Sequence, residues 1–258
     1  SSTKGGGARP GWLLAGLAGA VVGTAVCALG LLASWSRGAW LGFAAGLVVL
    51  LFFLPRRRRH GLTLLLAGGG AALALLGAGV LLNRLPVGVV ERAASSFSDD
   101  LQFGDVRGVD ITDANYAVLE RLAHWQAAVG MAEAHPWLGV GFGNYEPAYA
   151  QYRLINWPDA LGHAHNYYLN LLAEVGVLGL AAYGVWWTAV FWQAIRLLPR
   201  LDWRRRGVAL GLLAVWTALA VHHLVDKLYV NNVYVHLGAM LGVQQLLWLE
   251  TRAVSERG

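Results

Sequence analysis

The sequence has little charge and almost no cysteine. Only 14% of its 258 residues are charged, whereas 57% are apolar. Its single cysteine, Cys27, lies inside an apolar run, so the chain cannot build an internal disulfide framework. This composition is typical of a polytopic membrane protein rather than of a soluble domain.

The formal net charge of +5 does not indicate a protein that binds nucleic acid. Such binding needs basic side chains clustered on a soluble face. Here the basic residues flank apolar runs, which is the distribution found beside membrane spans. We therefore expect membrane lipids, and no nucleic acid, among the partners of this chain.

Six apolar runs approach the roughly 20 residues that a transmembrane helix needs. The second run is short and begins beside Arg37, so we expect its outer end to lie in protein or in a water-filled cleft. The sequence therefore predicts an all-α fold, a polytopic bundle of about six transmembrane helices. The predicted spans are Trp12–Ala33, Ala39–Leu54, Leu62–Leu82, Tyr167–Trp192, Val208–Leu224 and Val233–Leu249.

The arginines predict how these spans are oriented. Arg56–Arg59 separate the second and third spans, while Arg196, Arg200 and Arg204–Arg206 separate the fourth and fifth. Basic residues concentrate on the cytoplasmic side of a membrane, so both termini are predicted to be inside. The expected domains are residues 1–82 with three spans, an extracytoplasmic loop domain at 83–162, and residues 163–258 with three more spans.

The outer segment 83–162 is acidic and holds ten of the fifteen Asp and Glu residues. Turn-forming residues and weak periodicity predict a loop at 95–113, whose Asp residues match no EF-hand or Asp-x-Asp motif. We therefore expect no metal there. A helix is predicted over 116–135, and a short helix at the membrane interface within 145–157. The apolar stripe of the longer helix comprises Val118, Leu122, Trp125, Val129 and Ala132, with Arg121 and His124 on another face.

The stretch His163–Gly179 marks the change from the outer segment to the fourth span. Ionisable groups at membrane depth favour a functional role, although His165 also fits a plain interfacial residue with Asn166 as a weak helix cap. Glu174 lies roughly 13 Å along such a helix, too far to contact His165, and is expected to be a buried structural group. Read as one helix, the stretch has two faces, one with His165, Leu169, Leu172, Gly176 and Gly179, the other with Asn166, Asn170 and Glu174.

Three blocks of the sequence together resemble the superfamily of O-antigen ligases and polymerases, over most of residues 25–190. The family signature is His-Asn, nine residues, then Gly-x-x-Gly-x-x-Gly, and here Ala182 replaces the third glycine. Residues 139–143 supply a glycine-rich turn, not a nucleotide-binding fingerprint. The blocks are Ser36-Arg37-Gly38, the run from Arg121-Leu-Ala-His-Trp125 through His135-Pro136 to Gly143-Asn144, and His165-Asn166 with Gly176 and Gly179.

The resemblance implies roles for particular side chains. It implies that His165 is a general base and that Arg37 and Arg121 bind a lipid diphosphate, with neither a metal nor a cofactor. An imidazole suits this role because its ordinary pKa is near neutrality, and a guanidinium grips a diphosphate through paired hydrogen bonds. Four further residues are expected around His165, namely His163, Asn166, His223 and Asp226.

The resemblance also implies a substrate and a location. The donor would be an undecaprenyl-diphosphate-linked glycan and the acceptor a lipid or glycan hydroxyl. The active site would face outward from the bacterial cytoplasmic membrane. Relatives carry more membrane helices, so we expect this chain, which begins at Ser1, to be the C-terminal part of a longer protein.

Three alternatives remain open at this stage. A polymerase would use the same donor with a carrier-linked acceptor. A transporter would use His165 and Glu174 as a proton path, but it would need further ionisable groups towards the cytoplasm, and residues 176–191 contain none. A non-catalytic assembly scaffold would function without His165.

Overall fold

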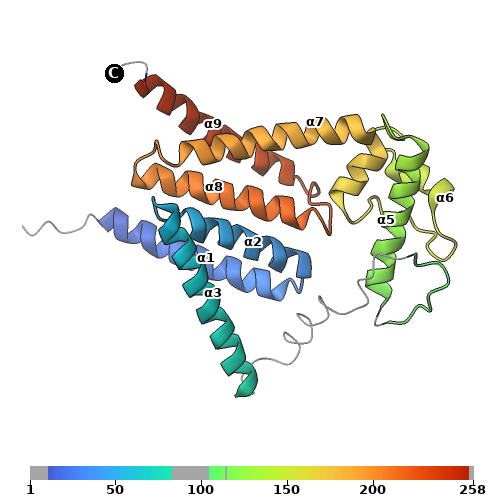
Figure 1. Cartoon of the computed structure of the whole chain (residues 1–258), viewed down its shortest axis with the longest axis horizontal. Helices are drawn as coiled ribbons and strands as arrows, with labels where there is room; N and C mark the ends of the chain where they lie inside the picture. Colours follow the sequence, from blue (N-terminus) through green and yellow to red (C-terminus); the bar gives the residue numbers. More distant parts are fainter. Residues whose placement is uncertain (1–10, 83–104, 114, 256–258) are drawn as a thin grey trace, which may run out of the picture.

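A computed structural model describes residues 11–82, 105–113 and 115–255 (Figure 1). These residues form eight α-helices and no β-strand, which confirms the predicted all-α fold. The predicted loop at 95–113 lies partly outside the described residues. The helices are α1 (Gly11–Ala33), α2 (Arg37–Phe53), α3 (Arg58–Leu81), α5 (Tyr116–Ala134), α6 (Tyr145–Tyr152), α7 (Tyr167–Leu197), α8 (Trp203–His222) and α9 (Val233–Ser255).

Each of the six predicted spans coincides with one of these helices. Three stretches are long and apolar enough to cross a membrane, namely Leu14–Ala33, Arg58–Gly79 and Tyr167–Leu197, and α2 is a shorter apolar helix. Large apolar side chains remain exposed along α1, as expected of a helix surrounded by lipid. The arrangement is that of an all-α membrane bundle.

Glycines let α2 approach α8 very closely. Gly38, Gly42 and Gly46 recur at every fourth residue, so they share one face of α2. A Cβ at Gly42 would lie 2.7 Å from the carbonyl oxygen of Ala218, and one at Gly46 would lie 2.8 Å from that of Ala214. Small residues at this spacing are a common way for helices to pack in lipid. The spacing was visible in the sequence, but we did not predict this interface.

Polar side chains inside the bundle join three helices. Trp216 of α8 donates its indole N–H to Gln244 of α9 at 2.8 Å. The Gln244 amide donates to the Gln193 side chain at 2.9 Å and to the Val190 carbonyl at 3.0 Å, both on α7. Interhelical hydrogen bonds of this kind stabilise membrane bundles by about 1 kcal/mol each. They fix how α7, α8 and α9 pack against one another.

Arg206 binds the free carbonyl groups at the C-terminal end of α2. Its side chain is buried, and its guanidinium donates to the carbonyl oxygens of Phe53, Leu54 and Pro55. Carbonyls at a helix C-terminus have no partner within the helix, and a cation is favoured there. Arg206, which the sequence reading counted among the charges of the cytoplasmic side, therefore links the start of α8 to the end of α2.

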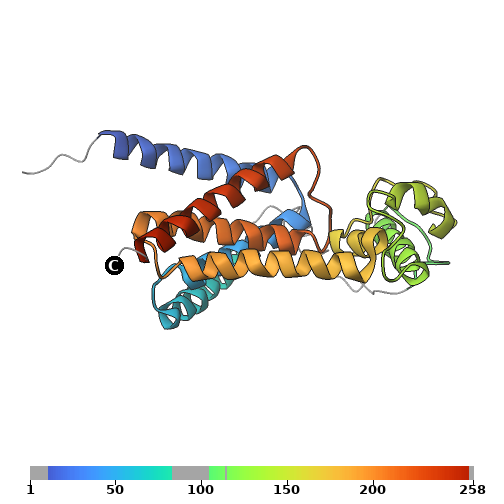
Figure 2. The same cartoon turned by 90° about the horizontal axis from the view of Figure 1, so that it is seen from above.

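The outer helices α5 and α6 lie at one end of the bundle, beside the first turns of α7 (Figure 2). The predicted helix at 116–135 is confirmed, but the predicted apolar face was wrong in part. Val129 is exposed, whereas His124, placed on another face by the sequence reading, is only 1% exposed. The buried face of α5 packs its small residues Ala127 and Ala128 against α6 and α7, which leaves room for the larger His124.

Candidate active site

A break in α7 anchors the outer helices to the bundle. The backbone of α7 is not helical at Gly176, where φ is 64° and ψ is −168°, a conformation open almost only to glycine. The turn after α5 fits into this break. Val140 N–H donates to the Ala173 carbonyl and Gly141 N–H to the Glu174 carbonyl, at 2.9 and 2.8 Å. The break thus exchanges helical hydrogen bonds for bonds to the turn.

Two glycines make this close fit possible. A Cβ on Gly176 would lie 2.3 Å from the carbonyl carbon of Trp137, and a Cβ on Gly139 would lie 2.3 Å from that of Glu174. Gly139, Gly141 and Gly143 all have positive φ, which confirms the predicted turn. The glycine-rich turn at 139–143 and the glycine motif of α7 therefore pack directly against each other.

Gly176→Ala is expected to destabilise the protein severely, by at least about 3 kcal/mol, because backbone strain adds to a main-chain clash. The yield of monodisperse protein and its thermal midpoint in detergent should both fall. Gly184→Ala is the matched control, since that site on the same helix has no neighbour within 4 Å of a new Cβ. Equal stability of the two variants would contradict the proposed role of the break.

The structure confirms that the helix starts at Tyr167, as in the predicted span, and corrects the helical reading of the two residues before it. His165 was read as part of the helix, but its φ is 51°, so it lies in the left-handed region and α7 begins at Tyr167. The Asn166 side chain caps the helix by accepting the N–H groups of Tyr168 and Leu169 at 3.0 and 3.1 Å. Asn166 is thus an N-cap, and His165, which precedes the helix, does not share a helical face with Leu169 and Leu172.

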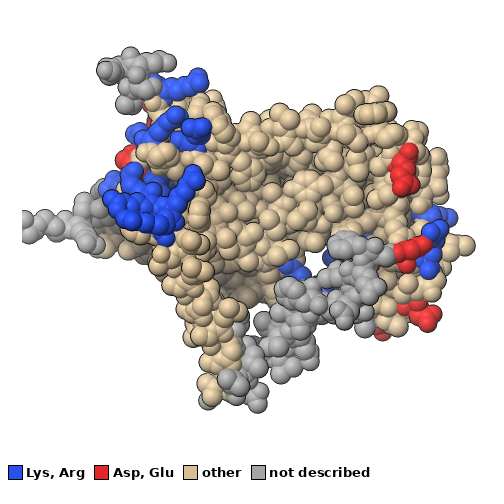
Figure 3. Space-filling model, in the orientation of Figure 1, with Lys and Arg blue, Asp and Glu red and all other residues tan. Residues whose placement is uncertain are grey.

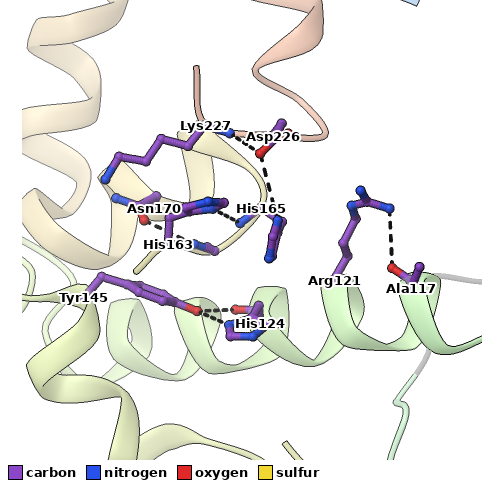
Figure 4. A network of polar contacts seen from close by, with 10 residues as sticks. Ala117, Arg121, His124, Tyr145, His163, His165, Asn170, Asp226 and Lys227 are labelled. Atoms are coloured by element: carbon purple, nitrogen blue, oxygen red, sulfur yellow. Dashed lines mark hydrogen bonds and ion pairs between the residues drawn. The ribbon is translucent and has the colours of Figure 1, made fainter. Parts of the chain in front are cut away.

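Three segments bring polar side chains together around His165 (Figure 4). Its Nδ1 lies 3.9 Å from the Asp226 carboxylate, which belongs to the loop after α8. Its backbone N–H donates to His163 Nδ1 at 3.1 Å. Its Nε2 is buried and has no hydrogen-bond partner among the described residues. The loop bearing Asp226 is tied to α7 because Tyr167 N–H donates to the His223 carbonyl at 2.8 Å.

His124 of α5 packs against the His165 ring, a contact that the sequence did not predict. Its ring meets the His165 ring edge-on at 5.4 Å and stacks on Tyr149 at 4.8 Å. Its Nδ1 lies 2.9 Å from the Tyr145 hydroxyl, which also donates to the His124 carbonyl. Tyr145 N–H in turn donates to Glu174, which is buried as predicted. A signal existed in the sequence, because His124 lies three residues after Arg121 on one helix.

The surroundings keep His165 neutral. Burial, reinforced by the charges of His163, His124 and Arg121, lowers the pKa of His165 to about 4 against the opposing effect of Asp226. Burial also lowers the pKa of His124 to about 4 and shifts that of His163 downward. The ring is therefore neutral at physiological pH, and its buried Nε2 makes no hydrogen bond to the described residues.

The predicted arginines lie on different elements. Arg121 of α5 flanks His165 in Figure 4, and its positive charge lowers the pKa of both His163 and His165. Arg37 is the first residue of α2. The next residue, Gly38, is so close to α8 that a Cβ there would lie 2.7 Å from the His222 ring.

His223 lies in an aromatic cluster at the start of α7. His223 is buried among aromatic rings, with Tyr167 and Tyr229 each 4.8 Å away. Its backbone carbonyl also accepts the N–H of Tyr167, so His223 contacts the start of α7 through both its ring and its main chain. Among the residues predicted around His165, His163 and Asp226 contact it directly.

The same cluster has the composition of a metal site. One ligand atom from each of His163, His165 and Asp226 lies within 4.8 Å of the others. Two imidazoles and a carboxylate are the ligands of some catalytic zinc sites. The sequence predicts no metal, whereas the structure groups three possible ligands.

Comparison with known proteins identifies the family of this chain. The profile described as O-antigen ligase matches residues 22–184, which include Arg37, Arg121 and His165. The search of curated proteins found no match. The matched region is more than half of the chain and carries both glycine motifs that form the break in α7. This chain belongs to the O-antigen ligase family.

Proposed function

We propose that this membrane protein transfers a glycan from an undecaprenyl-diphosphate carrier to an acceptor hydroxyl. The family supports an envelope enzyme acting on a lipid-linked glycan. The observation that carries the finer proposal is the neutral His165, with Asp226 facing its Nδ1 and a buried Nε2 without a partner. The neutral ring can take up the proton of a hydroxyl that reaches Nε2, and the Asp226 carboxylate is placed to stabilise the imidazolium that forms.

In the proposed reaction the acceptor oxygen attacks the anomeric carbon of the glycan. Its proton passes to His165 Nε2, and the bond between the anomeric carbon and the diphosphate oxygen breaks. Asp226 stabilises the imidazolium that results. Direct displacement inverts the anomeric centre, and the carrier leaves as undecaprenyl diphosphate.

Arg121 and Arg37 are proposed to stabilise the negative charge that develops on the leaving diphosphate. Positioned cations often supply the largest part of such catalysis. Arg121 is already close enough for its charge to act on His165. Arg37 begins α2, which packs against the end of α8 just before the loop that carries Asp226. We propose that one bound diphosphate contacts both guanidiniums.

A cavity of about 690 Å³ beside α5 is a suitable place for the sugars. Its size falls in the range of small-molecule sites. It reaches Asn166, the neighbour of His165, and it combines an indole face with amide, carboxylate and guanidinium groups that can bind hydroxyls. Its polar and aromatic lining includes Asp105, Arg107, Trp125, Gln126, Glu133 and Asn166.

The acceptor distinguishes a ligase from a polymerase, and we favour the ligase. A polymerase holds two diphosphate carriers, yet the outer segment has only five arginines against ten carboxylates. The test supplies purified protein with carrier-linked repeat units, with and without lipid A-core. We expect glycan to appear on lipid A-core only. Lengthening of carrier-linked chains without another acceptor would favour the polymerase instead.

Transfer is expected to survive strong chelation, because two arginines can neutralise the diphosphate without a cation. The measurement is the transfer rate after dialysis against EDTA, with the metal content of the protein determined in parallel. If EDTA abolishes transfer and zinc restores it, then His163, His165 and Asp226 hold an ion, and the base mechanism is wrong.

The active site is expected to face outward, because the arginine-rich loops lie at the opposite end of the bundle. In a Cys27→Ala background, Ile155→Cys should react with an impermeant thiol reagent in intact cells, since Ile155 is 93% exposed beside the site. Arg57→Cys should react only with a permeant reagent. The reverse pattern of labelling would overturn this orientation.

A further inference from the structure

The end of the bundle remote from His165 carries a dense group of arginines. Figure 3 shows them as a blue cluster over the ends of α7, α8 and α9 and the start of α3, opposite the end that carries α5 and α6. None of them belongs to the proposed reaction. The group comprises Arg56–Arg59, Arg196, Arg200, Arg204–Arg206 and Arg252.

A cavity of about 640 Å³ opens within this group. It lies where the turn between α7 and α8 meets the last turns of α9. Its floor is aromatic and its rim is charged, with three guanidiniums against two carboxylates. The lining includes Trp192, Trp248, Arg200, Arg205, Arg252, Asp202 and Glu250.

Three arginines make cation–π contacts with the two tryptophan rings of the cavity. The guanidinium carbons of Arg200 and Arg252 lie 5.4 and 5.5 Å from the centre of the Trp248 ring. Arg196 lies 5.6 Å from the centre of the Trp192 ring. Cations at this distance are attracted by the aromatic face. Two arginines from different elements therefore converge on one indole at the cavity.

The carboxylates of the cavity already have a partner in Arg205. Its Nη1 lies 3.0 Å from Glu250, and its Nε lies 3.5 Å from Asp202. The Asp202 side chain also caps α8 by accepting the N–H groups of Arg204 and Arg205. Because these contacts offset both carboxylates, the cavity keeps a net positive charge.

Apolar surface continues from the cavity along the bundle. Trp192 of α7 is 52% exposed, and Leu246 and Leu249 of α9 are 63% and 51% exposed. Tryptophans commonly lie at the boundary between acyl chains and headgroups. The cavity is therefore at headgroup level, with an apolar surface for acyl chains beside it.

We propose that this cavity binds the headgroup phosphate of an anionic phospholipid. Arg200 and Arg252 contact the phosphate oxygens, and the acyl chains lie against the exposed side chains of α7 and α9. Basic pockets between helix ends on the cytoplasmic side are known sites for such headgroups. The proposal does not depend on the chemistry of His165. A bound lipid would join the ends of α7, α8 and α9.

The test is native mass spectrometry of the purified protein with added phosphatidylglycerol or phosphatidylcholine. Arg200→Gln/Arg252→Gln should bind phosphatidylglycerol on the order of 10- to 30-fold more weakly, since each basic residue contributes about 1 kcal/mol. The matched control is Arg57→Gln/Arg59→Gln, which removes the same charge from the same end without touching the cavity. It should bind within about threefold of the unmodified protein.

Three outcomes would overturn the proposal. Equal loss in both double variants would mean diffuse attraction, and equal binding of the two lipids would mean that the headgroup charge is not recognised. Displacement of phosphatidylglycerol by equimolar inorganic phosphate would identify a free-anion site instead. The variant Arg200→Lys/Arg252→Lys keeps both positive charges and should recover part of the binding. If its helical content and that of the glutamine variant are unchanged, the weaker binding reflects lost contacts and not lost folding.

Discussion

His165→Ala is expected to abolish detectable glycan transfer while leaving a folded protein. The imidazole is the proposed acceptor of the hydroxyl proton, and losing a general base lowers rates by about 10²- to 10⁴-fold. Folding should survive because His165 precedes the first turn of α7, which Asn166 caps without it. The measurement is the rate of transfer by purified variant protein of unchanged thermal midpoint.

His163→Ala is the matched control, and it should slow transfer much less. The Nδ1 of His163 accepts the backbone N–H of His165, so His163 is expected to position the loop and not to accept the proton. A protein that needs His163 but not His165 would show that the base has been misassigned. Transfer by His165→Ala at the normal rate would show that His165 is not the base.

The pH profile gives an independent measure of the same base. Because burial holds the pKa of His165 at about 4, the imidazole stays neutral through mildly acidic pH. The transfer rate should therefore be constant above this pKa and fall as the pH decreases through about 4. A fall centred near 6.5 would indicate a solvated histidine and contradict the buried geometry.

Arg121→Gln is expected to lower the rate of transfer by about 10²- to 10³-fold, as is Arg37→Gln, because each removes a positive charge from the leaving diphosphate. The effect should appear mainly in kcat, since the charge that they stabilise grows as the bond breaks. Arg121→Lys should recover only part of the rate, because an ammonium cannot make paired hydrogen bonds. Rates with a defined carrier-linked donor would measure these effects.

Arg153→Gln is the matched control for a charge on the outer segment. Arg153 follows α6 and donates to the Pro158 carbonyl at 3.1 Å, outside the His165 cluster. Its removal should change the rate by less than about threefold, as for an exposed charge. A comparable loss at Arg153 would mean that general outer charge, rather than two particular guanidiniums, attracts the donor. If Arg37 and Arg121 act on one diphosphate, the double variant should lose less than the product of the single losses.

Local composition was sufficient to predict the helices of this protein. Apolar runs such as 167–192 form helices because a buried or lipid-facing backbone must satisfy its own hydrogen bonds. Periodicity likewise predicted the outer helix, and turn-forming glycines predicted the loop at 139–143. Family blocks pointed to His165, Arg37 and Arg121 before any geometry was available. All of these signals lie within short stretches of sequence.

Contacts between distant segments required the tertiary structure. Asp226 follows His165 by about sixty residues, and only the docking of the loop after α8 on α7 brings the two together. Sequence periodicity placed His124 outside the apolar face, although the packing of α6 and α7 buries it beside His165. The reason is that side-chain burial depends on which surfaces dock, and not on the helix alone.

For the glycines, too, the sequence predicted one part of their role and the tertiary structure decided the other. The sequence by itself determined where glycine occurs and predicted a turn at 139–143. Only the tertiary structure decided that Gly139 and Gly176 face each other across a break in α7, because main chains approach that closely only where neither residue carries a Cβ. That contact holds the outer helices on the membrane bundle and thereby places Arg121 and His124 beside His165.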